Sequence, residues 1–329
     1  MLARAREILI YEVNMDYSKC NYKGRYVYSA KEYLNAIKAN YFNLAYDPKN
    51  RGKMLEEIER IMNYNSSVDI FALAYLLFDE GTESSYDRAY NCLDLIVSWD
   101  YTPAKYLLGQ MYFLGARVDK DLDRFFELTQ EAAKDNYIPA KNALAYAYFN
   151  GYGCKADHAK ARKLLEECID KASYGVAYYN AGVGYMQGSF GYPKDERKAL
   201  AYFQEASYQY YKSASYNLGV MYLEGKGCPK NIQKGLQELA EAANLGHLNA
   251  QKKLGDAYYF GKITTKNLER AYTYYLMAAE NGDPYSMYSV GYMIVKKEYM
   301  WVDRYEGIKW LQKASYKGYE AATKLLNDL

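Results

Sequence analysis

The stretch ALAYAYFNGYGCKADHAKARKLLEECIDKA, residues 143–172, decides the fold because it holds two helical patterns on either side of a glycine-rich turn. Apolar and small residues in its first half recur at steps of three and four, which places them on one helix face. Gly151 can take the left-handed conformation that ends a helix. Asp157 is an N-cap residue type directly before the second pattern. The stretch therefore predicts a helix–turn–helix unit.

This unit recurs along the chain, and each copy has the same anatomy. The leading small residue returns after 36 or 37 residues, at Ala104, Ala140, Ala177, Ala214, Ala250 and Ser286. A glycine closes the first helix of five copies, at Gly115, Gly151, Gly188, Gly225 and Gly261. A capping type starts each second helix, at Ser85, Asp121, Asp157, Asp195, Asn231, Asn267 and Asp303.

Stacking of these copies sets the expected architecture. One helix pair cannot bury its apolar side alone, so neighbouring copies must cover one another. We expect an all-α, right-handed α-solenoid of about seven repeats over residues 67–329, ending in a half repeat at Ala322. Residues 1–66 lack the repeat, and we interpret them as a divergent helical N-terminal cap.

Two recurring motifs carry a resemblance to a known family. Leu-Gly-x-x-Tyr begins at Leu108, Leu218 and Leu254, and a Gly-x-Gly turn occurs at 151–153 and 225–227. The pattern over residues 68–329 resembles the Sel-like repeat (SLR) family, which is related to tetratricopeptide repeats. Arg117 and Ile263 replace the second turn glycine, and Lys297 replaces a closing glycine. The resemblance implies adaptor or scaffold work in signalling, assembly or host–microbe contact.

Composition and charge argue against several other classes of function. The 329 residues carry a net charge of +2, which gives no basis for nucleic-acid binding, and no apolar run is long enough to insert in a membrane. Five cysteines without metal-ligand spacing favour free thiols and a cytoplasmic location. His158 and His247 are expected at exposed turn positions. We expect no catalytic residue, no metal and no cofactor, and hence no enzyme.

A column of basic residues near the start of the second helices has two readings. A solvated or snorkelling structural role is favoured over a site for an anionic ligand. The column comprises Arg88, Arg124, Lys160, Lys198, Lys234 and Arg270.

The expected partner site lies on the first helices, which line the concave groove in related solenoids. Tyrosine gives rigid contact area, asparagine can bond a peptide backbone, and lysine can pair with a carboxylate. The same tyrosines could instead pack between repeats, and the asparagines could bond neighbouring backbone or face water. The candidates are Tyr106, Asn142, Tyr179, Asn180, Tyr216, Asn217, Lys252, Lys253, Asp256 and Tyr288.

These features predict a scaffold or adaptor that binds a protein or peptide on the concave face. An alternative is a regulatory or immunity-type subunit that inhibits or activates a partner enzyme by occlusion. Both need a long binding surface and no catalytic group.

Overall fold

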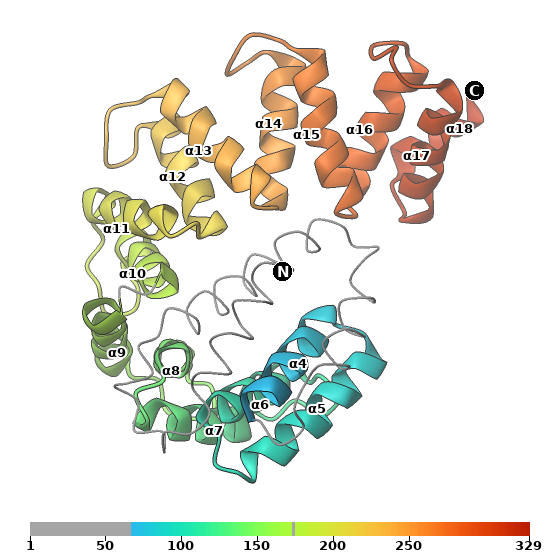
Figure 1. Cartoon of the computed structure of the whole chain (residues 1–329). Coiled ribbons are helices and arrows are strands. Elements are labelled where there is room, and N and C mark those ends of the chain that lie inside the picture. Colours follow the sequence, from blue (N-terminus) through green and yellow to red (C-terminus); the bar gives the residue numbers. More distant parts are fainter. Residues whose placement is uncertain (1–66, 173–174) are drawn as a thin grey trace. The chain divides into compact units, whose positions relative to one another are not determined.

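The computed structural model describes residues 67–172 and 175–329, and within these ranges every regular element is an α-helix (Figure 1). The chain divides into two compact units, residues 1–174 and 175–329, which are treated separately below. The expected cap over residues 1–66 lies outside the described residues.

The described part of the N-terminal unit contains three antiparallel helix pairs. They are α4 (Ser67–Glu80) with α5 (Glu83–Val97), α6 (Thr102–Leu114) with α7 (Leu122–Lys134), and α8 (Ile138–Asn150) with α9 (His158–Ala172). Residues from α4, α5 and α6 share one apolar core, in which Leu77, Leu93 and Met111 are fully buried.

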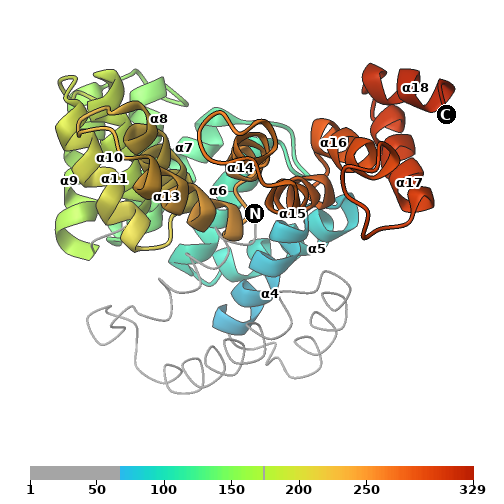
Figure 2. The same ribbon diagram turned by 90° about the horizontal axis from the view of Figure 1, so that it is seen from above.

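The C-terminal unit contains four further pairs and a last single helix, and Figure 2 shows α18 beside α16 and α17. The pairs are α10 (Gly175–Gln187) with α11 (Glu196–Tyr208), α12 (Lys212–Glu224) with α13 (Ile232–Asn244), α14 (Leu248–Phe260) with α15 (Leu268–Glu280), and α16 (Pro284–Val295) with α17 (Arg304–Tyr316). Helix α18 (Glu320–Asn327) packs on α17. The predicted seven helix pairs and closing half repeat are therefore confirmed.

Small residues at the predicted column allow the two helices of a pair to approach closely. A Cβ atom on Gly219 would lie 2.8 Å from the Leu239 side chain, and one on Gly291 would lie 2.7 Å from the Gly307 carbonyl oxygen. These distances are below van der Waals contact, so no larger residue fits without a shift of the neighbouring helix.

Side-chain caps start the second helices as predicted, with one correction. The carboxylate of Asp121 accepts from the Arg124 amide, three residues on, and the same geometry recurs at Asp157, Asp195, Asn231 and Asn267. Asp303 also caps its helix but accepts from the Tyr305 amide, two residues on. The prediction for Ser85 is wrong because α5 begins earlier. Thr82 is its N-cap, and Ser85 is the third helical residue of a reciprocal capping box.

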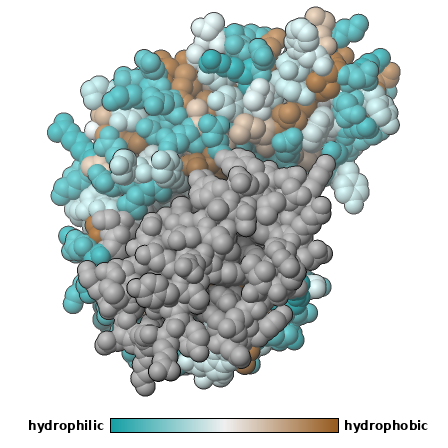
Figure 3. Space-filling view, in the orientation of Figure 1, coloured by the Kyte–Doolittle hydropathy of each residue, from teal (hydrophilic) through white to brown (hydrophobic). Residues whose placement is uncertain are grey.

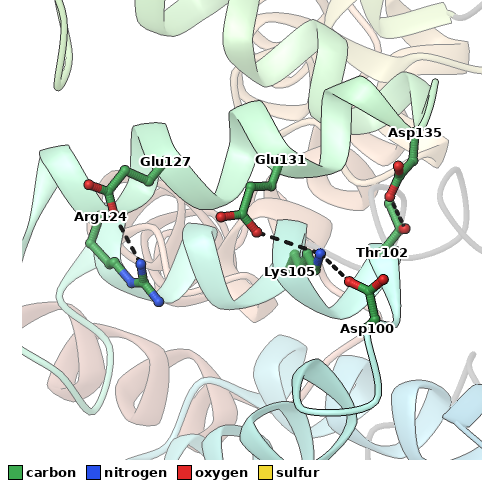
Figure 4. Close-up of polar contacts among 7 residues, drawn as sticks. All are labelled: Asp100, Thr102, Lys105, Arg124, Glu127, Glu131 and Asp135. Atoms are coloured by element: carbon green, nitrogen blue, oxygen red, sulfur yellow. Dashed lines mark hydrogen bonds and ion pairs between the residues drawn. The ribbon is translucent and has the colours of Figure 1, made fainter.

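A lysine near the start of the first helix ties together two pairs of the N-terminal unit, α6–α7 and α8–α9. Lys105 forms ion pairs with Asp100 and with Glu131 of α7, and Thr102 donates to Asp135 at the end of α7 (Figure 4). In the next pair, Lys141 Nζ lies 2.9 Å from Glu167 Oε2 of α9. Lys141 is itself buried, so this ion pair compensates a charge that would otherwise be costly to bury.

The basic column has the structural role favoured from the sequence. Four of the six cations cover the tyrosine of their own pair's first helix, as in Lys160 over Tyr148 at 5.2 Å and Lys198 over Tyr185 at 5.3 Å from the ring centroid. Arg270 also donates to the Tyr258 hydroxyl at 3.1 Å. These contacts are cation–π interactions within the helix pair.

The four described cysteines are free thiols. Burial raises the pKa of the Cys154 and Cys228 thiols, and it raises the pKa of Cys168 to about 12. A raised pKa keeps the thiol protonated and unreactive, which fits small apolar packing roles. Across the described ranges, no helix combines the length and the apolar character needed to cross a lipid bilayer.

Residues in the left-handed conformation follow both helices of a pair. Those after the second helices were not predicted from the sequence. The second helices end beside Asp100, Asn136, Tyr210, Gly246, Gly282 or Gly318, all at positive φ. Tyr210 has φ 60° and Lys297, at the closing position of α16, has φ 58°. A side chain at such a φ is strained by about 1–2 kcal/mol.

We therefore expect Tyr210→Gly and Lys297→Gly each to raise the free energy of unfolding by about 1 kcal/mol or less, because glycine relieves the strain but is more flexible when unfolded. Urea denaturation measures this change. The matched control is Lys296→Gly, one residue from Lys297 at an ordinary negative φ, which should destabilise. A loss of stability in both test variants would contradict the assignment of strain.

Candidate functional site

The fifth residue of the first helices has a shared contact that explains half of the candidate residues. Each of these side chains packs on the residue that caps the next first helix. The pairs are Tyr106 with Tyr137 in the N-terminal unit, and Tyr179 with Tyr211, Tyr216 with His247, Lys252 with Asp283 and Tyr288 with Tyr319 in the C-terminal unit. This column therefore joins consecutive repeats.

Tyr106 is taken up most completely by this contact. Its side chain is only 7% exposed, and its ring meets Tyr137 edge-on at 5.6 Å. A partner could touch little of it. The other members of the column are half-buried, so each keeps an accessible edge beside its packing contact.

The asparagine candidates are half-buried and already interact with their surroundings. Asn217 of α12 bonds the Tyr179 hydroxyl of α10, while burial raises the pKa of that tyrosine. Asn142 and Asn180 also interact with neighbouring groups. The alternative that these side chains satisfy local partners is therefore supported for all three, and a partner would have to share them.

A cluster of charges and tyrosine hydroxyls lies where α14, α15 and α16 meet. Lys252 Nζ lies 2.8 Å from Asp283 Oδ1, and Lys252 also lies 5.7 Å from the centre of the Tyr285 ring. Tyr275 and Tyr285 both donate to Asp256 Oδ1, at 2.7 and 2.8 Å. Tyr275 is almost fully buried, so its hydroxyl needs this acceptor.

Asp283 is the residue that organises the Lys252 side of this cluster. It caps α16 by accepting from the Ser286 amide at 2.8 Å and from the Ser286 hydroxyl at 2.7 Å. These bonds and the Lys252 charge hold the pKa of its carboxyl below the usual value, although burial acts in the opposite direction. Lys252 is therefore engaged in a structural ion pair.

Lys253 differs from Lys252 although it is the next residue. It is half-buried like Lys252, but among the described residues it forms no ion pair. Asp256 lies one turn further along α14, and both tyrosine hydroxyls bond its Oδ1 atom, so Oδ2 remains able to accept. Lys253, Asp256 and Tyr288 thus combine a cation, an acceptor and an aromatic edge on neighbouring first helices.

Several members of this cluster were missed by the sequence reading. Tyr259 donates to Glu298 at 2.9 Å, and burial together with that carboxylate raises its pKa. The sequence analysis assigned no role to Tyr275 or Tyr285. One feature of the sequence could have indicated the role of Asp283. It stands before a proline and three residues before Ser286, as an N-cap does.

The expectation for His247 needs a correction. It is half-buried, where an exposed turn position was predicted, because its Nδ1 accepts from the Ala250 amide at 3.3 Å and its ring stacks on Tyr216 at 4.4 Å. Burial lowers its pKa to about 4. It acts as a neutral helix cap. His158 is exposed, as expected.

Tandem helix pairs with small mating residues, glycine-closed first helices and capped second helices define a helical-repeat protein. Family comparison agrees with this architecture. The Sel1 repeat model matches residues 102–137, 138–170, 175–211, 212–247, 248–283 and 284–319, so the chain belongs to the Sel1 repeat family. The resemblance to Sel-like repeats is confirmed.

Solved structures with the same fold support this assignment. A Sel1 repeat protein from Oxalobacter formigenes has a TM-score of 0.59 and 25% identity, and the match covers 74% of this chain and 98% of that one. A protective antigen of uropathogenic Escherichia coli with an SLR fold has a TM-score of 0.58 and 24% identity, and the match covers 83% of this chain and 58% of that one.

A curated relative is similar over a shorter range. The ERAD-associated E3 ubiquitin-protein ligase component HRD3B of Arabidopsis thaliana is 35% identical over 115 residues. These residues are 34% of this chain but only 17% of that protein. The likeness therefore concerns a run of repeats and does not extend to the whole relative.

Proposed function

We propose that this chain is a scaffold or adaptor that binds a segment of another protein on its first helices, chiefly on α14 and α16. The observation that carries the proposal is Lys253. It is a half-buried cation without an ion pair among the described residues, one helical turn before an aspartate whose Oδ2 atom can accept, and the half-buried Tyr288 lies on the next first helix. An acidic side chain or a chain terminus would complete this arrangement.

The neighbouring repeats of the C-terminal unit would extend the same surface. Asn180 and Asn217 can each bond a peptide backbone through the part of the amide that stays accessible. Tyr179 and Tyr216 would add ring edges, and Lys252 would act by holding Asp283 in place. The free thiols fit a reducing compartment such as the cytoplasm. Asn142 and Tyr106 belong to the N-terminal unit and would contribute least.

Charge reversal at Lys253 tests the proposal. A partner is first captured with the wild-type chain, identified by mass spectrometry, purified and titrated. We expect Lys253→Glu to weaken its binding about tenfold or more, since one attractive contact becomes repulsive, and to do so less at high salt. The melting temperature should stay unchanged because Lys253 forms no ion pair with the described residues.

Two controls make the result specific. Lys230→Glu reverses an exposed charge in the α12–α13 turn and should leave binding unchanged. Asp256→Asn keeps an acceptor and removes the charge, so it should weaken binding only if the partner offers a cation. Equal affinity of the wild type and Lys253→Glu would reject this site. If the partner is an enzyme whose activity changes on binding, the regulatory-subunit alternative gains direct support.

A further inference from the structure

The turn between α16 and α17 differs from the other turns at this position of the repeat. Met300 is 78% exposed and Trp301 is 87% exposed. In the described part of the chain, no other turn between a first and a second helix carries a large apolar side chain that is exposed. The coloured part of the surface in Figure 3 is mainly hydrophilic, with scattered apolar areas. Two adjacent exposed apolar residues here require an explanation.

The residues before this pair are held firmly. Glu298 accepts from the Tyr259 hydroxyl of α14 at 2.9 Å, and its amide bonds the Met293 carbonyl at 2.8 Å. The Tyr299 ring stacks on Tyr272 of α15 at 3.8 Å with an interplanar angle of 8°. The turn is thus fixed to the preceding helix pair.

The residues after the pair are held as well. Val302 packs against the apolar core of the C-terminal unit, and Asp303 caps α17 by accepting from the Tyr305 amide at 2.7 Å. Between these anchors, Met300 and Trp301 face solvent. A loop fixed in this way loses little conformational freedom on binding, which favours its use as a preorganised contact.

Three cations and three acids lie next to the tip. Lys296, Lys297 and Arg304 are exposed and form no ion pair among the described residues. Each nearby acid has a partner: Glu298 accepts from Tyr259, Asp303 accepts from the Tyr305 amide, and Glu306 pairs with Lys309 at 2.7 Å. The two apolar side chains therefore lie beside three cations that have no ion-pair partner among the described residues.

We propose that Met300 and Trp301 form a docking tip for an acidic, amphipathic segment of another protein, separate from the first-helix site. Apolar side chains of that segment cover the tip, and its carboxylates pair with Lys296, Lys297 and Arg304. Tryptophan commonly supplies much of the binding energy in such contacts. A lipid surface fits less well, because two side chains bury too little apolar area to hold a protein on a bilayer.

A displayed library of random peptides, selected on the full-length wild-type chain, tests this docking tip. Enriched peptides should carry apolar residues together with Asp or Glu. Met300→Ser/Trp301→Ser should weaken their binding about tenfold or more. Lys296→Glu/Arg304→Glu should also weaken it, and the loss should shrink at high salt. Tyr208→Ser removes an equally exposed aromatic residue elsewhere and should change nothing.

Other outcomes would overturn the proposal. Enriched peptides without acidic residues, or peptides that bind the tip variant as tightly as the wild type, would contradict it. Cosedimentation with phosphatidylserine–phosphatidylcholine vesicles that is lost in the tip variant would assign the tip to lipid. A wild type that dimerises while the tip variant stays monomeric would assign it to a second copy of this chain. Circular dichroism melts should first show that the variants fold.

Discussion

Replacement of Gly227 by alanine is expected to lower the free energy of unfolding by at least about 3 kcal/mol. Gly227 has φ +70°, and a Cβ atom there would overlap the carbonyl oxygen of Glu196, at the start of α11 in the preceding helix pair. The obstacle is backbone, which cannot rotate away as a side chain can. The variant must therefore separate two repeats or rebuild the turn.

Gly246→Ala is the matched control for this experiment. Gly246 has φ +80° in the same unit, and nothing lies within 4 Å of an added Cβ atom. The free energy of unfolding of this variant should fall only by the strain of an alanine in the left-handed conformation, about 1–2 kcal/mol. Urea denaturation followed by circular dichroism compares the two. Equal losses would show that the turn relaxes and that close contact with Glu196 is not required.

The α6–α7 turn shows how a side chain is tolerated at the equivalent position. Arg117 has φ 70°, and its side chain forms an ion pair with Asp87 of the preceding second helix. A polar contact there takes the place of the close backbone approach seen at Gly227. The sequence alone indicated that Arg117 departs from the glycine pattern, but it could not indicate what the arginine contacts.

Local and periodic features of the fold were predictable from the sequence. Gly115, Gly151 and Gly225 end first helices in the left-handed conformation, as their recurrence suggested. Asp121 and Asn231 cap second helices through their own side chains. Such features depend on a few neighbouring residues and recur in six or seven repeats. The pattern therefore stays recognisable when one repeat departs from it.

The contacts of the candidate site were less predictable because they join residues about one repeat apart. Lys252 and Lys253 look equivalent in the sequence, yet Lys252 pairs with Asp283, 31 residues away, and Lys253 does not. Asp256 gains two tyrosine hydroxyls from two different helices. The repeat period shows which residues share a helix face. Which residue each side chain contacts depends on side-chain geometry between neighbouring repeats.

His247 gives the chain an expected loss of stability in acid. Its pKa is lowered to about 4, chiefly by burial and secondly by the charge of Lys212, against 6.5 for an ordinary histidine. The unfolded chain therefore binds this proton more readily than the folded chain. The stabilisation is complete above about pH 6.5 and is lost as the pH falls toward 4. A shift of this size corresponds to at most about 3 kcal/mol.

Protonation would also remove a helix cap. Nδ1 of His247 accepts the Ala250 amide, and an imidazolium has no free acceptor. His247→Asn should keep a neutral acceptor at the cap and so lose most of this pH dependence, while losing the stacking on Tyr216. At neutral pH the variant should therefore be somewhat less stable than the wild type, and the difference should narrow or reverse near pH 4.

Urea denaturation of both chains at several pH values between neutral and about 4 measures this difference directly. Titration of carboxylates, common to both chains, cancels in the comparison. His158→Asn is the control, because His158 is exposed and should leave the profile unchanged. Parallel profiles for the wild type and His247→Asn would show that His247 protonates equally in the folded and unfolded chain. The neutral cap would then have no part in holding α14 against the preceding repeat.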